Sequence, residues 1–162
     1  MKAVIYSIER VGTGTLSTMA RPRGGDWLVD ELEALRAEGV DVVVSMLTAS
    51  EARELELEDE ARAATAAGLQ FVELPTPDRS TPGVSEFKAL IELLEAQLCD
   101  EKHVVVHCRM GIGRSSLVAA GILMIEGVSA PNAWAAIAKA RGLAVPDTLV
   151  QKDWLDAVLT SW

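Results

Sequence analysis

The sequence contains little cysteine. Only Cys99 and Cys108 occur among its 162 residues, too few for the disulfide framework of a small secreted protein. The apolar run 103–107 lies between them, and as a strand at roughly 3.3 Å per residue it would hold them about 16 Å apart. A disulfide requires Cα atoms within about 7 Å of each other. At least one of the two is therefore expected to be a free thiol.

Positive charge and long apolar runs are also scarce. The chain has 15 Lys and Arg against 24 Asp and Glu, a formal net charge of −9. Such a chain gains little from neutralising a phosphate backbone, so nucleic-acid binding is not expected. No apolar run approaches the roughly 18 residues that span a bilayer. The N-terminal segment meets an acid at Glu9 and has no small-residue cleavage site. We therefore expect no membrane insertion and a cytoplasmic location.

Aromatic residues make up only 4% of the chain, but 49% of its residues are hydrophobic and most lie in short runs. Continuous apolar runs such as 41–47 are typical of parallel strands that are buried on both faces. The patterns predict strands over 3–8, 15–19, 41–47, 69–74 and 103–107. They predict helices over 26–37, within 49–68, and over 82–99, 115–126, 130–141 and 148–160. This alternation indicates one α/β domain over residues 1–162, with a mostly parallel central sheet flanked by helices.

Ligands of such sheets bind beyond the carboxyl ends of the strands. Four loops are expected at this edge, the last because two successive helices lead the chain away and back: 48–50, 75–82, 108–114 and 142–147. Every candidate functional residue described below lies in or beside these loops.

A cysteine opens one of these loops, and an arginine follows six positions later. The segment reads His107-Cys108-Arg109-Met110-Gly111-Ile112-Gly113-Arg114-Ser115. Backbone N–H groups in a strand-to-helix loop form a nest for a tetrahedral anion, which also stabilises a thiolate. The glycines permit the tight turn, and Arg114 offers a planar fork to two phosphate oxygens. A thiolate below a phosphate cradle is a nucleophile directed at phosphorus. The alternative interpretation is a buried cysteine followed by an ordinary turn.

This segment resembles the signature H-C-x-x-G-x-x-R-S/T of the cysteine-dependent protein tyrosine phosphatases, and especially their small dual-specificity group of the kinase-associated phosphatase type. The resemblance implies a single phosphatase catalytic domain that needs no metal and no cofactor. It implies that Cys108 attacks phosphorus to form a phosphocysteine, that Arg114 binds the phosphoryl group, and that Ser115 donates to the cysteine sulfur. The phosphate would be held by the loop residues Arg109, Met110, Gly111, Ile112, Gly113 and Arg114. His107 would order the loop from behind, and a satisfied core histidine is compatible with that role.

The resemblance also implies a general acid on a separate loop. Asp78 lies among prolines after a predicted strand and matches that position. Its alternative role is an Asx-type turn or a helix cap. Asp147 is a rival, although capping of the last helix is the expected role there.

Further candidates lie around these residues. Gln151 matches a family glutamine that orients the attacking water, or else it is an ordinary exposed glutamine. Arg79 either meets a substrate anion or ties down its loop. For Arg21 and Arg23, pairing with nearby acids is expected over a place at the rim of the site. The acidic stretch 51–60 is interpreted as a solvated helical face, and Cys99 as a small core residue.

The expected substrate is a phosphorylated protein or a small phosphomonoester. The short chain lacks the long tyrosine-recognition loop of the classical tyrosine phosphatases, so its cleft should accept phosphotyrosine and also phosphoserine or phosphothreonine. A phosphoinositide substrate is an alternative, but the two loop lysines of such enzymes are replaced here by Arg109 and Ile112. A phosphate-binding pseudophosphatase is the second alternative. An arsenate reductase would need additional cysteines, and a sulfurtransferase would not need Asp78.

Overall fold

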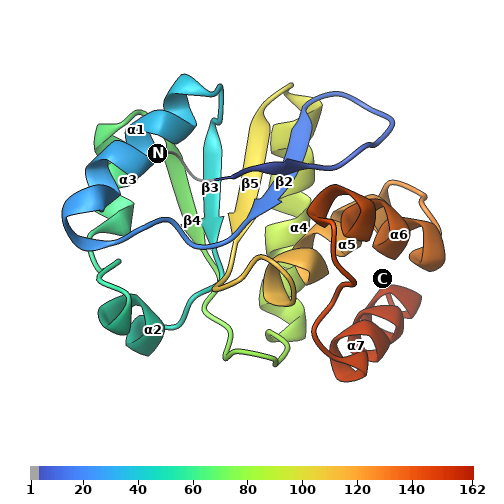
Figure 1. Cartoon of the computed structure of the whole chain (residues 1–162). Helices are drawn as coiled ribbons and strands as arrows, with labels where there is room; N and C mark the ends of the chain where they lie inside the picture. The colour runs from blue at the N-terminus through green and yellow to red at the C-terminus, as the bar shows by residue number, and fades with distance from the viewer. Residues whose placement is uncertain (1–3) are drawn as a thin grey trace.

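The computed structural model describes residues 4–162 and contains a five-stranded sheet of order β1-β2-β5-β3-β4 (Figure 1). The strands are β1 Tyr6–Ser7, β2 Thr15–Met19, β3 Val42–Ser45, β4 Gln70–Glu73 and β5 His103–His107. Strand β1 is antiparallel to β2, and the other neighbours pair in parallel. The α/β class and the mostly parallel sheet are thereby confirmed.

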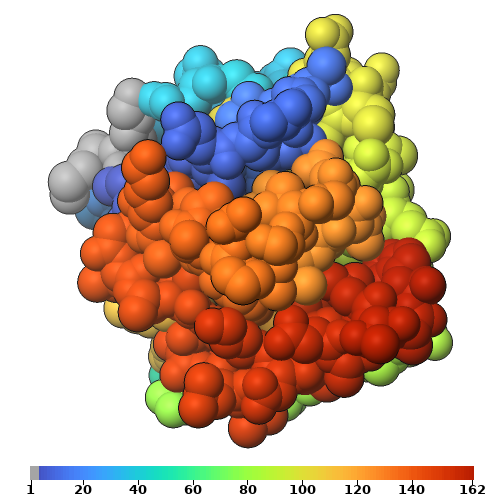
Figure 2. Space-filling view, turned by 90° about the vertical axis from the view of Figure 1, so that its right-hand side faces the viewer, coloured from blue at the N-terminus to red at the C-terminus, as the bar shows by residue number. Residues whose placement is uncertain are grey.

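Helices cover both faces of the sheet. A 3-10 helix, Gly25–Trp27, leads into the first of them. The α-helices are α1 Leu28–Ala37, α2 Ala49–Glu54, α3 Glu60–Ala66, α4 Val84–Cys99, α5 Arg114–Ile125, α6 Ala130–Arg141 and α7 Leu149–Thr160. Figure 1 shows α1 and α3 on one side of the sheet and α4 to α7 on the other. Figure 2 shows α6 and α7 exposed on one face of the molecule, below the β1–β2 segment.

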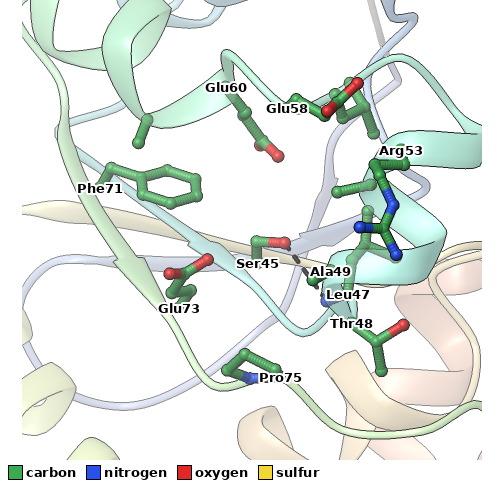
Figure 3. A pocket seen from close by; sticks show the side chains of 13 residues that line it. Ser45, Leu47, Thr48, Ala49, Arg53, Glu58, Glu60, Phe71, Glu73 and Pro75 are labelled. Carbon is green, nitrogen blue, oxygen red and sulfur yellow. Dashed lines mark hydrogen bonds between the residues drawn. The ribbon is translucent and has the colours of Figure 1, made fainter.

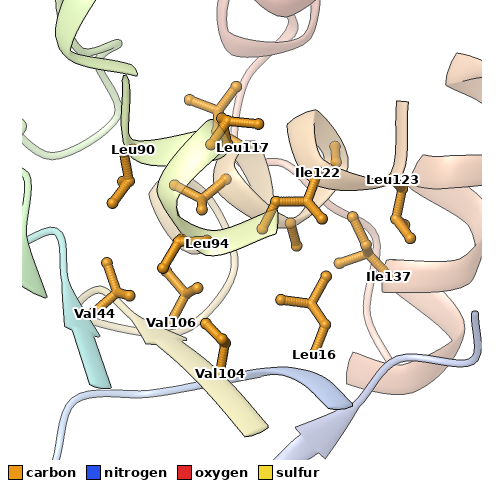
Figure 4. Packing of buried hydrophobic residues seen from close by; sticks show 14 of the residues in the cluster. Leu16, Val44, Leu90, Leu94, Val104, Val106, Leu117, Ile122, Leu123 and Ile137 are labelled. Atoms are coloured by element: carbon orange, nitrogen blue, oxygen red, sulfur yellow. The ribbon is translucent and has the colours of Figure 1, made fainter. Parts of the chain in front are cut away.

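The alternation of side chains along the strands builds two cores. Val44 and Val106 point into the larger core with α4 and α5, whereas Val43 and Val105 point into the smaller core with α1 and α3. Figure 4 shows strand residues of the larger core packed beneath Leu94, Leu117 and other side chains of these helices. Every residue of the central strands β3 and β5 except His103 is buried. Burial on both faces explains why each strand contains three consecutive valines instead of alternating apolar and polar residues.

The predicted boundaries hold for most elements, and two details differ. The strand predicted at 3–8 is confined to β1, Tyr6–Ser7, and residue 3 lies outside the described residues. The helical segment 49–68 is divided between α2 and α3, because Glu56 adopts a positive φ of 57° and Leu57 turns into the core. Trp27, the last residue of the 3-10 helix that precedes α1, is 55% exposed, with Arg23 stacked over its ring.

The parallel register brings several strand ends to one edge of the sheet. His107, the last residue of β5, is paired with both Met19 of β2 and Ser45 of β3. The chain therefore leaves these strands at the same level, and the loops that follow β3 and β5 lie side by side. No helix within residues 4–162 is long and apolar enough to cross a membrane.

Candidate active site

The loop of residues 108–113 joins β5 to α5 at this edge. Cys108 is only 3% exposed, and its Sγ lies 3.3 Å from the Oγ of Ser115 in the first turn of α5. Gly111 has a φ of 73°, and a Cβ there would lie 2.7 Å from the carbonyl carbon of Met19. The loop is thus pressed against the end of β2, and the backbone N–H of Arg21 donates to the Arg109 carbonyl at 3.2 Å. Glycine is required at position 111 for both reasons.

Arg114 is buried behind this loop and is held by a carboxylate that the sequence analysis did not select. Its Nη1 and Nη2 donate to the two carboxylate oxygens of Glu51 at 2.6 and 2.9 Å, and Nη1 also donates to the Thr76 carbonyl at 2.8 Å. The guanidinium is thereby fixed in a bidentate pair. Its Nε is buried and has no hydrogen-bond partner among residues 4–162. The Nε–H group of the positively charged Arg114 is therefore available to donate a hydrogen bond to a bound anion.

Arg114 and Glu51 each stabilise the charged form of the other. Burial alone would lower the pKa of Arg114, but its hydrogen bonds to Glu51 and the nearby charges raise it. Burial would likewise raise the pKa of Glu51, yet hydrogen bonds from Arg114 and Thr48 lower it. Both groups are consequently charged at neutral pH.

The sequence signal for Glu51 is its capping-box spacing from Thr48. The structure contains this capping box, which places Glu51 beside the loop that follows β3.

A second buried carboxylate lies behind the loop. Glu60, the first residue of α3, is 3% exposed, and its Oε2 lies 2.6 Å from Nε2 of His107. The other ring nitrogen, Nδ1, lies 3.3 Å from the carbonyl oxygen of Cys108. The interpretation of residues 51–60 as a solvated helical face is therefore wrong for Glu51 and Glu60, which both point inward, Glu51 to Arg114 and Glu60 to His107.

Asp78 lies on the loop between β4 and α4, at the open side of the site. Its side chain is 53% exposed, and its Oδ1 lies 3.3 Å from Nη2 of Arg114. The neighbouring Arg79 is exposed and adopts a positive φ of 61°. The structure thus brings the predicted acid to the predicted phosphate-binding arginine, although the two are distant in the sequence.

The loop before α7 reaches the same site. A Cβ at Gly113 would lie 2.2 Å from Oδ2 of Asp147 and 3.1 Å from Nε2 of Gln151, so both side chains lie against the start of α5. Gln151 is fully buried and its Nε2 donates to the Ser80 carbonyl at 3.3 Å. Asp147 was expected to cap the last helix, but the N-cap is Thr148, whose hydroxyl accepts from the Gln151 N–H. Of the two alternatives for Gln151, the ordinary exposed glutamine is likewise wrong.

The remaining loop residues form the outer rim. Arg109 donates to Glu54 at 2.9 Å, and this hydrogen bond raises the pKa of its guanidinium. Met110 is 58% exposed, and its carbonyl accepts from Arg141 at 3.1 Å. Ile112 is half-buried.

Arg21, Arg23 and Cys99 lie outside the phosphate-binding loop. Arg23 pairs with Glu31, and the Arg21 side chain donates to the Pro22 carbonyl at 3.2 Å. Cys99 was expected in the core but is an exposed free thiol that donates to Glu95 at 3.1 Å.

Comparison with known proteins identifies the family of the chain. Residues 17–128 match the family described as "Polymorphic toxin system, DSP-PTPase phosphatase". The chain belongs to this family. The cyclin-dependent kinase inhibitor 3 of Rattus norvegicus is 31% identical over 83 residues, which cover 50% of this chain and 39% of the rat protein. The aligned stretch thus spans well under half of that relative.

Solved structures share the fold of this DSP-PTPase member. A crystal structure of kinase associated phosphatase, with serine in place of its catalytic site cysteine, superimposes with a TM-score of 0.91 at 21% identity, covering 99% of this chain and 96% of that one. The active form of Tk-PTP superimposes with a TM-score of 0.77 at 23% identity, covering 97% and 98% of the two chains. The predicted phosphatase fold is confirmed over the described length of the chain.

Proposed function

We propose that this protein is a metal-independent cysteine phosphatase that hydrolyses phosphomonoesters through a phosphocysteine. The observation that carries the proposal is the pairing of the buried Cys108 with Arg114, whose guanidinium is locked by Glu51 while its buried Nε is left for an anion. A fixed cation beside a nucleophile stabilises the charge of a transferring phosphoryl group without reorganisation.

In the first chemical step, the Cys108 thiolate attacks phosphorus and the bond from phosphorus to the ester oxygen breaks. Asp78, whose carboxyl group lies 3.3 Å from Arg114 at the open side of the site, gives its proton to the leaving oxygen. The electron pair of the broken bond remains on that oxygen, and the product alcohol or phenol departs. Cys108 then carries the phosphoryl group, which Arg114 and the backbone N–H groups of residues 109–114 bind.

In the second step, water attacks phosphorus and the bond between sulfur and phosphorus breaks. Asp78, now a carboxylate, takes the proton of the water, and inorganic phosphate forms. Ser115, with its hydroxyl 3.3 Å from the sulfur, donates to the departing thiolate. Gln151 is buried beside Gly113 and is suited to orient the water, with Asp147 next to it.

The rim favours a phosphorylated protein or a simple phosphomonoester over a phosphoinositide. A lipid headgroup with several phosphates requires free positive charge, whereas Arg109 is already paired with Glu54 at 2.9 Å and lies 3.8 Å from Glu51. The exposed Arg79 leaves a cation for an acidic group next to a phosphorylated residue. We accordingly propose phosphotyrosine as a substrate, together with phosphoserine and phosphothreonine.

Two further parts of the proposal concern the whole chain. We place it in the cytoplasm, because a catalytic thiol has to remain reduced. We also treat residues 1–162 as one phosphatase catalytic domain, since both cores are built on the same five-stranded sheet.

The test is hydrolysis of p-nitrophenyl phosphate in excess chelator by the wild type, Cys108→Ser and Cys99→Ser. Cys99→Ser is the matched control, because that thiol is exposed and belongs to the last residue of α4, outside the loop. We expect turnover that survives the chelator, persists in Cys99→Ser and disappears in Cys108→Ser. A folded wild type that binds inorganic phosphate but turns over neither this ester nor phosphopeptides would indicate a pseudophosphatase and overturn the proposal.

A further inference from the structure

His107 and Cys108 are neighbours in the chain, but their side chains lie on opposite faces of the sheet. Cys108 belongs to the larger core beneath α4 and α5. His107 is fully buried on the other face, where Glu60 reaches it from the first turn of α3. This carboxylate thus approaches the catalytic loop from behind, without lining the phosphate cradle itself.

The two contacts of the His107 ring match a ring that carries two protons. Nε2 lies 2.6 Å from a carboxylate oxygen of Glu60, and Nδ1 lies 3.3 Å from the carbonyl oxygen of Cys108. A carbonyl only accepts, and an ionised carboxylate only accepts, whereas a neutral imidazole has a single N–H to donate. Both contacts are satisfied when each ring nitrogen carries a proton and the imidazolium is balanced by the Glu60 carboxylate.

The contact to the Cys108 carbonyl orients the phosphate loop. The peptide that joins Cys108 to Arg109 is planar and trans, so its N–H points opposite to its carbonyl. With the carbonyl bound by His107 from behind, the N–H of Arg109 is directed toward the open side of the loop. A second proton on the ring would also place a positive charge next to the residue that carries the thiolate, which favours that anion.

Glu60 differs from the neighbouring acidic residues in its burial. A pocket of about 350 Å³ lies beside it, and the charged groups that face this space are Arg53 and Glu58 together with Glu73 of β4 (Figure 3). Figure 3 shows Glu60 among them, at the start of α3. Glu58 is exposed and Glu73 is exposed, whereas Glu60 is buried and directed to His107.

We propose that Glu60 is a positioning residue for Cys108: it keeps His107 doubly protonated, and the ring in turn holds the Cys108 carbonyl and preorganises the loop for thiolate and phosphate. The effect of this positioning on catalysis rests on the proposed phosphatase function. Its geometry and its first test are independent of any turnover.

The first test is nitrogen NMR of the wild type labelled with ¹⁵N-histidine. The chain has only two histidines, and His103 is an internal control. Its Nε2 lies 2.8 Å from the Ser17 hydroxyl, and burial lowers the pKa of its ring, so it is neutral at pH 7.5. We expect two protonated ring nitrogens in His107 and one in His103. A singly protonated His107 in the wild type would overturn the proposal.

The second test is the alkylation of Cys108 by iodoacetate in a Cys99→Ser background. Glu60→Gln keeps the shape of the side chain and removes its charge, and Glu58→Gln is the matched control on the same pocket. We expect Glu60→Gln to slow alkylation at neutral pH and to lower kcat/KM, each by about tenfold, the scale of one hydrogen bond to a charged group. Glu58→Gln should leave both unchanged.

A double variant separates positioning from a purely structural role. In a His107→Asn background, Glu60→Gln should produce no further loss of the alkylation rate, because the group through which it acts is absent. An equal loss with and without His107, or an unchanged alkylation rate in folded Glu60→Gln, would contradict the proposal. If Glu60→Gln does not fold, the NMR result on the wild type still decides the protonation of His107. If the wild type shows the expected NMR and alkylation but hydrolyses no phosphoester, the proposed function fails and the positioning role stands.

Discussion

Acidic side chains lie on two sides of the phosphate loop, and their environments differ. At the open side, Asp78 and Asp147 are exposed residues on loops. Behind the loop, Glu51 and Glu60 are buried in the first turns of α2 and α3 and bind Arg114 and His107. The exposed pair lies where substrate and water arrive, whereas the buried pair contacts only groups of the protein.

The difference separates proton transfer from preorganisation. A general acid has to exchange its proton with solvent in every turnover, so exposure suits Asp78. A carboxylate that fixes a cation acts more strongly where water is excluded, because the effective dielectric constant is lower there. The buried pair should therefore control both stability and rate, and the exposed pair should control rate alone.

The largest effect is expected for Glu51→Gln. Removing one partner of a buried ion pair costs about 3 kcal/mol in the free energy of unfolding, and a misplaced Arg114 should lower kcat/KM by about 10³-fold. Urea denaturation and steady-state kinetics measure the two. The control is Glu54→Gln, whose carboxylate is 64% exposed in its pair with Arg109 and should contribute less than about 1 kcal/mol. Equal free energies of unfolding for the two variants would contradict the distinction between buried and exposed carboxylates.

The same carboxylate should shape stability in acid. The pKa of Glu51 is lowered in the folded protein, because hydrogen bonds from Arg114 and Thr48 outweigh the effect of burial. Its contribution is therefore fully present above the ordinary value of 4.5 and is lost as the pH falls through the lowered pKa. Denaturation below pH 4.5 should show a shallower loss of stability for Glu51→Gln than for the wild type. Parallel pH profiles would show that Arg114 does not hold this carboxylate ionised.

On the open side, Asp78→Ala should lower kcat by about 10²-fold for esters with poor leaving groups. The loss should be smaller for p-nitrophenyl phosphate, because its leaving group needs little protonation. The descending alkaline limb of the kcat profile should flatten, since this limb follows the loss of the acid's proton. The free energy of unfolding should change by no more than about 0.5 kcal/mol, as for other exposed side chains. A large loss of stability would place Asp78 with the buried carboxylates.

The sequence predicted the open side of the site better than the buried side. The loop from Cys108 to Arg114 is contiguous, and Asp78 follows a predicted strand, so local spacing and strand order are enough to place them. Glu51 and Glu60 bind partners 63 and 47 positions away, and no local pattern encodes those pairs. Their acidic neighbours suggested a solvated face, and the turn at Glu56 changed which acids point inward. Cys99 was misassigned because an exposed position at a helix end carries no periodicity of its own.

The smallest effect concerns Asp147, and two variants test it together. Asp147→Asn removes its charge, while Gly113→Ala displaces its carboxylate, since the new Cβ would lie 2.2 Å from Oδ2. The clash is with the tip of a side chain that can move, in contrast to the backbone contact at Gly111, so Gly113→Ala should still fold.

We expect each variant to lower kcat by about threefold, far below the 10²–10⁴ of a full general acid. The double variant should lose no more than either one, because both changes remove the same carboxylate from the start of α5. Single-turnover kinetics assign the loss to the formation or the hydrolysis of phosphocysteine. If Asp147→Asn matched Asp78→Ala in size and in its effect on the alkaline limb, Asp147 would share the acid role, and the open side would hold two proton donors instead of one.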